Sequence, residues 1–330
     1  MGQTTEHTSK KQTLLQKSLD ILLERRDLTL LAMIAIMTVV INQITPYFLT
    51  IVNMRTLGLA VSFNAIAVIG MTILMIGGGI DLSIGSVYGL TSILVGMWIS
   101  NGFPIIPAIM IGLLIGAAVG LLNAVLINKF LLSPFLATLG TMTLFRGLIW
   151  VLSGGHSVVG LPAAFTVLGQ TKLFDIQLPV FIMLVFVFVF DFLLRRSTFM
   201  RQMFYIGNNR DSAVFAGINA RRVTTIAYIL SGVLAAFAGI LDGSRLGAVY
   251  IQAGNGLEFQ VITAAVVGGT SLNGGKGTIF GAFLGAVVMT ILTNVFNLVG
   301  VSIYWQNVLV GIILVSVVAI DRFLTPREAR

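Results

Sequence analysis

The chain of 330 residues contains no cysteine, two histidines and few charged side chains, which make up 10% of the sequence. The lack of cysteine excludes disulfides, iron–sulfur clusters and thiol nucleophiles. The histidines, His7 and His156, are far apart and form no metal-ligand spacing such as H-x-x-x-H. No Ser–His–Asp set or carboxylate pair at helical spacing is present. We therefore expect no enzyme activity and no directly bound cofactor or metal.

Hydrophobic residues make up 57% of the chain, and the mean hydropathy is +1.00. A soluble domain is about 45–50% apolar and about 25% charged, so this composition predicts a multi-pass membrane protein. The apolar runs are too long for the alternating strands of a β-barrel, which leaves an all-α fold. Ten runs follow one another: 28–45, 58–76, 84–99, 105–127, 134–152, 178–194, 223–241, 259–268, 279–298 and 304–320.

The basic residues orient this ten-span arrangement. Ten spans place both termini on one side of the membrane, and a cytoplasmic N-terminus puts 16 of the 20 Lys and Arg residues in cytoplasmic segments. The exceptions are Arg55, Lys172, Arg245 and the intramembrane Arg146. The net charge of +8 is thus typical of basic cytoplasmic loops in contact with membrane lipid, and no nucleic-acid partner is expected.

The ten predicted spans divide the chain into a cytoplasmic tail over 1–27, a membrane domain over 28–320 and a second cytoplasmic tail over 321–330. Within the membrane domain, GxxxG steps occur at Gly112, Gly116 and Gly120, which predicts close packing of helix backbones.

A polar segment over 77–86 joins the second and third apolar runs. Three glycines open it and permit a turn, and either Asp81 or Ser83 is suited to cap the following helix. An acidic residue at this depth is also a functional candidate, because charge in a membrane is costly. Both interpretations, a capped turn and a functional site, stay open.

The basic loop over 195–222 is longer than most helix connections, which run about 2–8 residues. Asn209 is expected to cap a short helix over 210–216, and Gly217 to end it. Ala213, Val214 and Ala216 would give this helix a small apolar face. The loop suits either a groove on a cytoplasmic partner or the lipid headgroups.

The glycine-rich segment over 268–278 is not a P-loop. G-x-x-x-x-G-K-[ST] requires Gly where Thr270 stands and Ser or Thr where Gly277 stands, so we expect no ATP site in this chain. Three other polar residues lie in or beside spans. Arg146 would face water or contact backbone carbonyls, Asn64 would bond another helix, and Glu258 would face an outer vestibule.

Several of these segments together resemble the permease subunits of bacterial ABC importers of the ribose/xylose type, which belong with the branched-chain amino-acid permeases. The resemblance covers nearly the whole chain beyond the N-terminal tail, and the G-I-D-L-S-x-G-S segment is its most specific part. The matching stretches are 64–66, 70–72, 79–86, 135–140 with 146–147, and 266–271 with 274–277.

The resemblance implies a type II ABC importer fold and three kinds of partner: a cytoplasmic ATPase subunit that carries ATP and Mg, a periplasmic or extracellular sugar-binding protein, and a second permease copy. It implies import of a monosaccharide across the bacterial cytoplasmic membrane. The segment it implies for ATPase coupling comprises Gly207, Asn208, Asn209, Arg210, Asp211, Ala213, Gly217 and Ile218. The expected translocation path and gating turn comprise Asn64, Gly79, Asp81, Ser83, Gly85, Ser86, Arg146 and Glu258.

Other functions remain as alternatives. An ion-coupled secondary transporter would use intramembrane acids as ion sites, and this chain has few. Autoinducer-2 importers share the fold, an amino-acid importer is a near neighbour, and a structural or sensory subunit would carry no substrate.

Overall fold

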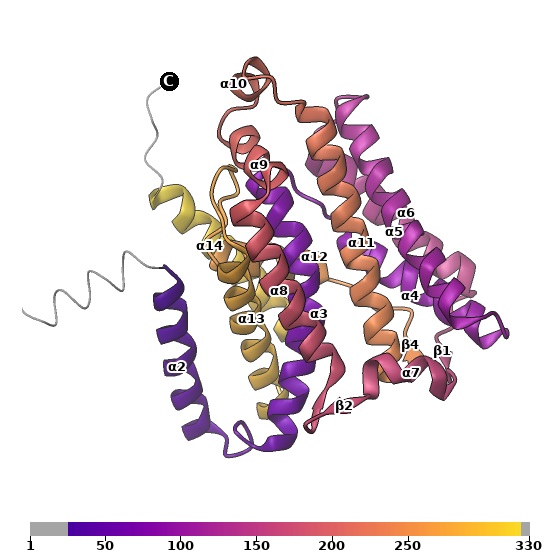
Figure 1. The fold of residues 1–330 in the computed structure, drawn as a ribbon. Coiled ribbons are helices and arrows are strands. Elements are labelled where there is room, and N and C mark those ends of the chain that lie inside the picture. The colour runs from indigo at the N-terminus through magenta and orange to yellow at the C-terminus, as the bar shows by residue number, and fades with distance from the viewer. Residues whose placement is uncertain (1–25, 325–330) are drawn as a thin grey trace, which may run out of the picture.

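A computed structural model describes residues 26–324 of the protein. The chain forms an antiparallel bundle of helices with two minimal strand pairs (Figure 1). The helices are α2 (Arg26–Ile44), α3 (Ile51–Ile76), α4 (Ile84–Ser100), α5 (Ile105–Asn128), α6 (Pro134–Ser153), α7 (Ala163–Gln170), α8 (Leu178–Arg196), α9 (Thr198–Asn208), α10 (Arg210–Phe215), α11 (Ala220–Leu246), α12 (Leu257–Val267), α13 (Ile279–Val299) and α14 (Ile303–Leu324). Strand β1 (Val158–Val159) pairs antiparallel with β4 (Ala248–Val249), and β2 (Lys172–Leu173) pairs with β3 (Ile176–Gln177).

Each of the ten predicted apolar runs falls on one helix: α2, α3, α4, α5, α6, α8, α11, α12, α13 or α14. Seven of these are long and apolar enough to cross a membrane, namely α2, α3, α5, α6, α8, α11 and α13. Helices α4 and α12 are shorter, as the runs predicted. The predicted tails lie outside the described residues, except that α2 begins at Arg26 and α14 continues to Leu324.

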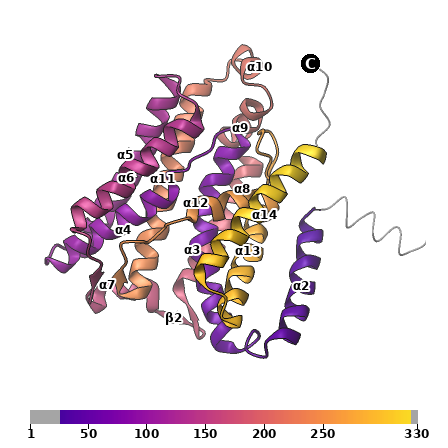
Figure 2. The ribbon, with the colours of Figure 1, turned by 180° about the vertical axis from the view of Figure 1, so that it is seen from behind.

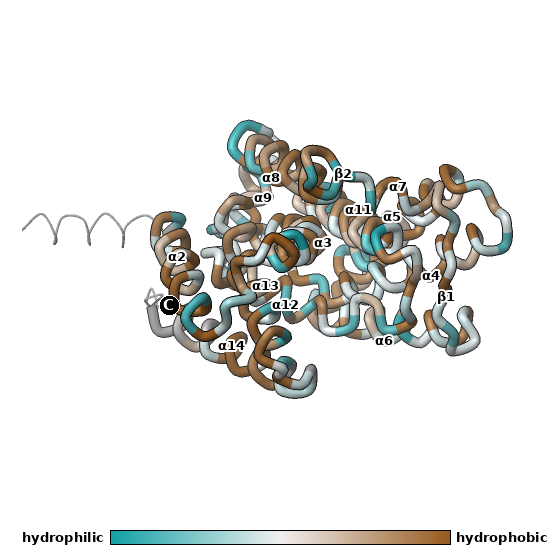
Figure 3. The backbone as a smooth tube through the Cα atoms, turned by 90° about the horizontal axis from the view of Figure 1, so that it is seen from below, coloured by the Kyte–Doolittle hydropathy of each residue, from teal (hydrophilic) through white to brown (hydrophobic). Residues whose placement is uncertain are grey.

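The bundle has two distinct ends (Figures 1 and 2). Helices α9 and α10 lie at one end, here the α10 end, together with the glycine-rich connection between α12 and α13. Helix α7 and the strand pairs lie at the opposite end, here the α7 end. Seen from that end, hydrophobic residues dominate the helices and the hydrophilic stretches are short (Figure 3).

Two groups of four helices repeat the same plan with opposite direction. Helices α3, α4, α5 and α6 form one group, and α11, α12, α13 and α14 form the other; in each, a short second helix follows a long first one. Helices α3, α4, α5 and α6 correspond, in that order, to α11, α12, α13 and α14. The contacts agree with this: the packing of α11 on α5 has its counterpart in the packing of α3 on α13, and that of α4 on α6 in that of α12 on α14. Because α3 runs toward the α10 end and α11 away from it, the repeat is inverted.

Helix α3 is the centre of the bundle, whereas α2 is peripheral. In the apolar window of α3, 89% of the residues are buried, against 11% for α2. Helix α3 contacts α11, α13, α8 and α12, so its side chains occupy the interior all round. A helix that is hydrophobic on every face is expected in this position, because no face meets a polar surface.

Glycines allow the closest helix contacts, as the GxxxG steps predicted. A Cβ on Gly116 would overlap the carbonyl oxygen of Gly232, and a Cβ on Gly120 would overlap that of Tyr228. Helix α5 therefore lies backbone to backbone on α11. Van der Waals packing of this kind holds helices together where lipid supplies no hydrophobic drive between them.

We predict that Gly116→Ala destabilises the protein although alanine favours helices. The added methyl group would meet Gly232 and Ala236 and force α5 from α11, an overpacking cost of about 1–3 kcal/mol. The measurement is thermal unfolding of the detergent-solubilised protein. Gly147→Ala is the control, because nothing lies within 4 Å of a Cβ at that glycine. Equal melting temperatures for the two variants would contradict this packing.

Candidate functional site

The candidate site begins where α4 and α12 meet. Both helices start inside the bundle, and their first turns are in contact: a Cβ on Gly85 would overlap the Gly254 carbonyl oxygen and the Glu258 carboxylate. We call the contact between these first turns the half-helix junction, because each helix spans only part of the bundle. From it, α4 runs to the α7 end and α12 to the α10 end. The amide N–H groups of these first turns have no bulk water that could accept their hydrogen bonds. Such starts are tolerated only where protein encloses them, and most residues of both helices are buried.

A buried hydrogen-bond network holds the start of α4. One oxygen of Asp81, Oδ1, accepts from the backbone N–H of Ser83 at 2.9 Å and from its hydroxyl at 2.6 Å. The other oxygen accepts from the Ser231 hydroxyl of α11 at 3.2 Å. The Asp81 carboxylate thus caps the approach to α4, as predicted, while Ser83 is the N-cap residue without a side-chain cap bond of its own.

Asn123 of α5 connects this network to α6. Its amide nitrogen donates to the Ser83 hydroxyl at 2.8 Å, and its oxygen accepts from the Thr141 hydroxyl at 2.7 Å. Asp81, Ser83, Asn123, Thr141 and Ser231 are all at most 4% exposed. These five residues, the Asp81 network, therefore join α4, α5, α6 and α11 without a basic partner among them.

Sequence reasoning singled out Asp81 and Ser83 as site residues, but not Asn123, Thr141 or Ser231. The one available signal was an isolated Asn in an otherwise apolar run. Tyr228 adds a further bond, in which its hydroxyl donates to the Ile80 carbonyl at 3.1 Å.

Arg146 and Glu258 lie on the other side of the half-helix junction. Arg146 donates to the Ala253 carbonyl oxygen at 2.9 Å, which confirms the predicted contact with a backbone carbonyl. Glu258 is 4% exposed, so the predicted outer vestibule is wrong: its side chain packs against the start of α4 instead. Within residues 26–324, Arg146 and Glu258 form no ion pair, and one carboxylate oxygen of Glu258 has no hydrogen-bond partner.

The remaining predicted path residues lie at separate helix contacts. Asn64 donates to the Thr290 hydroxyl at 3.2 Å, which joins α3 to α13. The Ser86 hydroxyl donates to the Met142 carbonyl at 2.8 Å, which joins α4 to α6. Gly79 lies beside Tyr228, whose hydroxyl would be 3.1 Å from a Cβ added there. The structure thus brings most of the predicted residues to the junction but leaves Asn64 at a different contact.

The predicted short helix in the basic loop is α10, which begins and ends near the predicted residues. The Asn209 side chain accepts from the Ser212 backbone N–H at 2.9 Å, and Gly217 has φ +84°. Ala213 is buried, so it is not part of the exposed apolar face that the sequence predicted. Val214 and Ala216 are exposed as predicted, and Phe215, which is 91% exposed, adds a large apolar side chain beside them.

Three backbones meet where α9 ends. The Gly275 N–H donates to the Ile76 carbonyl at 2.8 Å, and a Cβ on Gly207 would overlap both of these residues. A Cβ on Gly275 would likewise overlap the side chain of Asn208. This three-way contact links the end of α9 to the end of α3 and to the connection between α12 and α13. It therefore joins the loop that carries α10 to both groups of the inverted repeat.

The remaining predicted coupling residues fix α10 to the bundle. Arg210 donates to the Asn128 side-chain oxygen at the end of α5 at 3.3 Å, and Ile218 packs against the core. Asp211 is exposed in the first turn of α10.

We predict that Asn123→Leu destabilises the protein through lost hydrogen bonds. Leucine would remove the bonds of Asn123 to the Thr141 and Ser83 hydroxyls, each worth about 0.5–1.5 kcal/mol, while those hydroxyls keep their bonds to the Thr138 carbonyl and to Asp81. Asn101→Leu is the matched control, because Asn101 is exposed at the end of α4. Thermal unfolding in detergent compares the two. A melting temperature of Asn123→Leu equal to that of the control would contradict the network.

Comparison with known proteins identifies the chain's relatives. Residues 53–318 match the family model described as branched-chain amino acid transport system / permease component. The ribose import permease protein of Bacillus subtilis (strain 168) is 38% identical over 87% of this chain and 90% of that protein. The D-allose transport system permease protein of Escherichia coli (strain K12) is 33% identical over 88% and 90%.

A third relative is the autoinducer 2 import system permease protein of Yersinia pseudotuberculosis serotype O:3 (strain YPIII), which is 36% identical over 77% of this chain and 72% of its own length. No solved structure matches the chain.

Proposed function

The chain belongs to the family of branched-chain amino acid transport system permease components, and from this premise we propose that it is the permease subunit of an ATP-driven importer of a monosaccharide. It is a multi-pass protein of the bacterial inner membrane. The observation that carries the proposal is the likeness, over nine-tenths of their length, to permeases named for ribose and allose. The Yersinia relative makes autoinducer-2 the second candidate substrate.

We propose that all ten apolar helices cross the membrane or enter it, with both termini and the α10 end in the cytoplasm. The distribution of charge supports this orientation. Arg195, Arg196, Arg201, Arg210, Arg221, Arg222 and Lys276 all belong to segments at the α10 end. An excess of Lys and Arg in short loops is typical of the cytoplasmic side.

In this orientation α10 is the contact for a cytoplasmic ATPase subunit, which would carry ATP and Mg. Phe215 and Val214 project from the bundle and suit an apolar groove on that partner. A second permease copy completes the membrane unit, and a periplasmic or extracellular sugar-binding protein would deliver substrate at the α7 end. The family match and the importer permeases among the relatives support partners of these three classes.

The contacts suggest how ATPase closure reaches the membrane interior. Movement of α10 pulls on α9, whose last turn touches Ile76 and Gly275 through Gly207. Ile76 directly precedes the segment that carries the Asp81 network and α4, and Gly275 lies in the connection that follows α12. Both half-helices are therefore attached to the α9 contact. Alternating access results when the two shift in turn and move the half-helix junction.

The experiment that tests this function is uptake by proteoliposomes that contain the permease with its ATPase partner. We expect accumulation of labelled D-ribose or D-allose that requires internal ATP and the binding protein and survives a proton uncoupler. Uptake that collapses with the uncoupler while ATP remains would establish ion coupling, for which the buried Asp81 and Glu258 are the candidate acids. Uptake of autoinducer-2 or amino acids alone would change the substrate class.

We predict that Phe215→Asp weakens binding of the ATPase subunit about thirtyfold or more, since an exposed aromatic anchor is worth about 2 kcal/mol when it fills a partner's pocket. Co-purification of the ATPase and its sugar-stimulated hydrolysis measure the loss.

The matched control is Phe174→Asp. Phe174 is 95% exposed against 91% for Phe215, but it lies between β2 and β3 at the α7 end. ATPase retention should fall only for Phe215→Asp. An equal effect of the two substitutions, or none at Phe215, would remove α10 from the ATPase contact.

A further inference from the structure

A cavity of about 200 Å³ lies between α4, α11 and the segment that leads into α12. It is on the α7 side of the half-helix junction, and its walls include Ser92, Asp242, Gly243, Tyr250 and Gln252. The volume is several times what one water needs. Sites for drug-sized ligands typically have volumes of about 300–1,000 Å³, so this smaller cavity suits a molecule of about one ring.

The charge that Asp242 brings to the cavity wall is already paired with Arg245, which lies behind the wall. Arg245 donates through Nε to Asp242 Oδ1 at 3.0 Å, and its second contact with that oxygen is 2.9 Å. Arg245 also lies over the Phe63 ring, 5.3 Å from its centroid, which fixes the guanidinium. An amino acid carries two opposite charges and would need two unpaired charges in the wall. The Asp242–Arg245 pair instead suits a neutral ligand.

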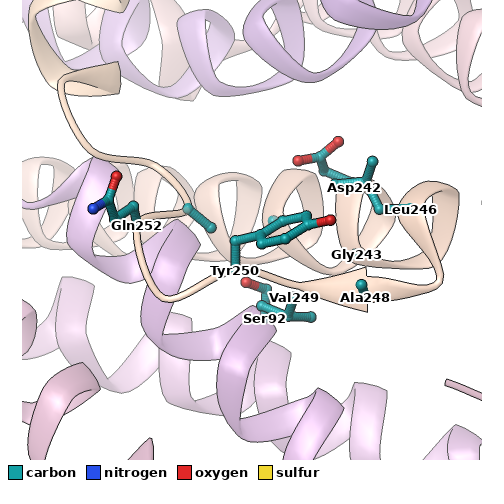
Figure 4. Close-up of a pocket in the computed structure, with 10 residues that line it drawn as sticks. Ser92, Asp242, Gly243, Leu246, Ala248, Val249, Tyr250 and Gln252 are labelled. Atoms are coloured by element: carbon teal, nitrogen blue, oxygen red, sulfur yellow. The ribbon is translucent and has the colours of Figure 1, made fainter. Parts of the chain in front are cut away.

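The uncharged groups of the wall suit hydroxyl groups on the ligand. In Figure 4 the Tyr250 ring is directed toward the Asp242 side of the pocket, and Gln252 lies at the opposite end. Within the described residues, the Tyr250 hydroxyl and the Gln252 amide make no hydrogen bond, so both are available. The Asp242 carboxylate is a strong acceptor for ligand hydroxyls, and the Tyr250 ring offers an apolar face.

The cavity is also connected to the half-helix junction. Ala253 lines it, and the Ala253 carbonyl accepts from Arg146. Three residues further, Gly256 is the N-cap of α12. A ligand in the cavity therefore touches the segment that positions α12.

We propose that this cavity binds one neutral monosaccharide on its way through the permease, with Asp242, Tyr250 and Gln252 bonded to its hydroxyl groups. The proposal rests on the proposed function and adds the residues and chemistry of a transport site to it. It explains why the cavity has a carboxylate, an amide and a phenol around a small volume.

The absence of cysteine provides a direct test, because a single introduced thiol is labelled without background. Ser92→Cys places the thiol in the cavity wall, and Ser100→Cys places one on the exposed end of the same helix. Both are reconstituted with the ATPase subunit and exposed to a membrane-impermeant thiol reagent. We expect D-ribose or D-allose, and not L-leucine, to slow labelling of Ser92→Cys and to leave Ser100→Cys unchanged.

Removal of one sugar contact should then weaken the protection. In the Ser92→Cys protein, Gln252→Ala is expected to raise the half-protecting sugar concentration about threefold to tenfold, the effect of one lost hydrogen bond. Gln252 is exposed, so the substitution does not disturb the core. If Ser92→Cys fails to assemble, Ala248→Cys, in another wall of the cavity, is the second reporter with the same expected result.

The outcomes separate this site from the proposed function. Labelling of both cavity reporters that no sugar slows, in a complex that imports sugar with ATP, overturns the site and leaves the function intact. Protection by L-leucine instead of sugar overturns the chemistry proposed for the site. Absence of any sugar import by the wild-type complex, with import of another substrate class, overturns the function itself.

Discussion

The structure depends on one constraint: two helices begin inside a membrane protein, where free backbone N–H groups have no water to bond. Helices α4 and α12 meet this constraint by starting against each other and against buried polar side chains. Lipid-exposed helix starts would leave several unsatisfied groups in hydrocarbon, each costing several kcal/mol. The surrounding long helices are therefore needed as an enclosure as well as a barrier.

The enclosure in turn explains the glycine content. Helix α11 must touch α3, α4 and α5 at once, and only small residues allow backbones this close. Gly239 contacts the backbone of Tyr88, and Gly232 that of Gly116. These contacts leave little freedom for the long helices. The connections before α4 and α12 are irregular instead, and they contain glycines at positive φ such as Gly78 and Gly254.

Much of the fold was accessible from the sequence because membrane helices have a strong one-dimensional signal. All ten apolar runs are helices, and the cap at Asn209 follows from local chemistry. The Asp81 network was not accessible in full, because it joins four segments that are far apart in the chain. The depth of Glu258 was misjudged for a related reason: a short run does not reveal whether its first turn faces solvent or another helix.

The cavity on the α7 side of the half-helix junction was not predicted from the sequence either. Asp242 and Arg245 form an i,i+3 pair near the end of a span, a pattern that local spacing alone makes visible. Their relation to Ser92 and Gln252 appears only when α4 and the segment before α12 are packed on α11.

The inverted repeat has a consequence for the shape of the transport cycle. The segment before α4 and the segment before α12 are counterparts, yet in this structure they differ: polar side chains fill the space around the first, and a cavity adjoins the second. Because the two halves share one plan with opposite direction, we expect each half to take the arrangement of the other during transport. Exchange of the two arrangements would close the cavity on the α7 side and open its counterpart toward the α10 end. The difference between the two halves therefore relates the two ends of the expected cycle to each other.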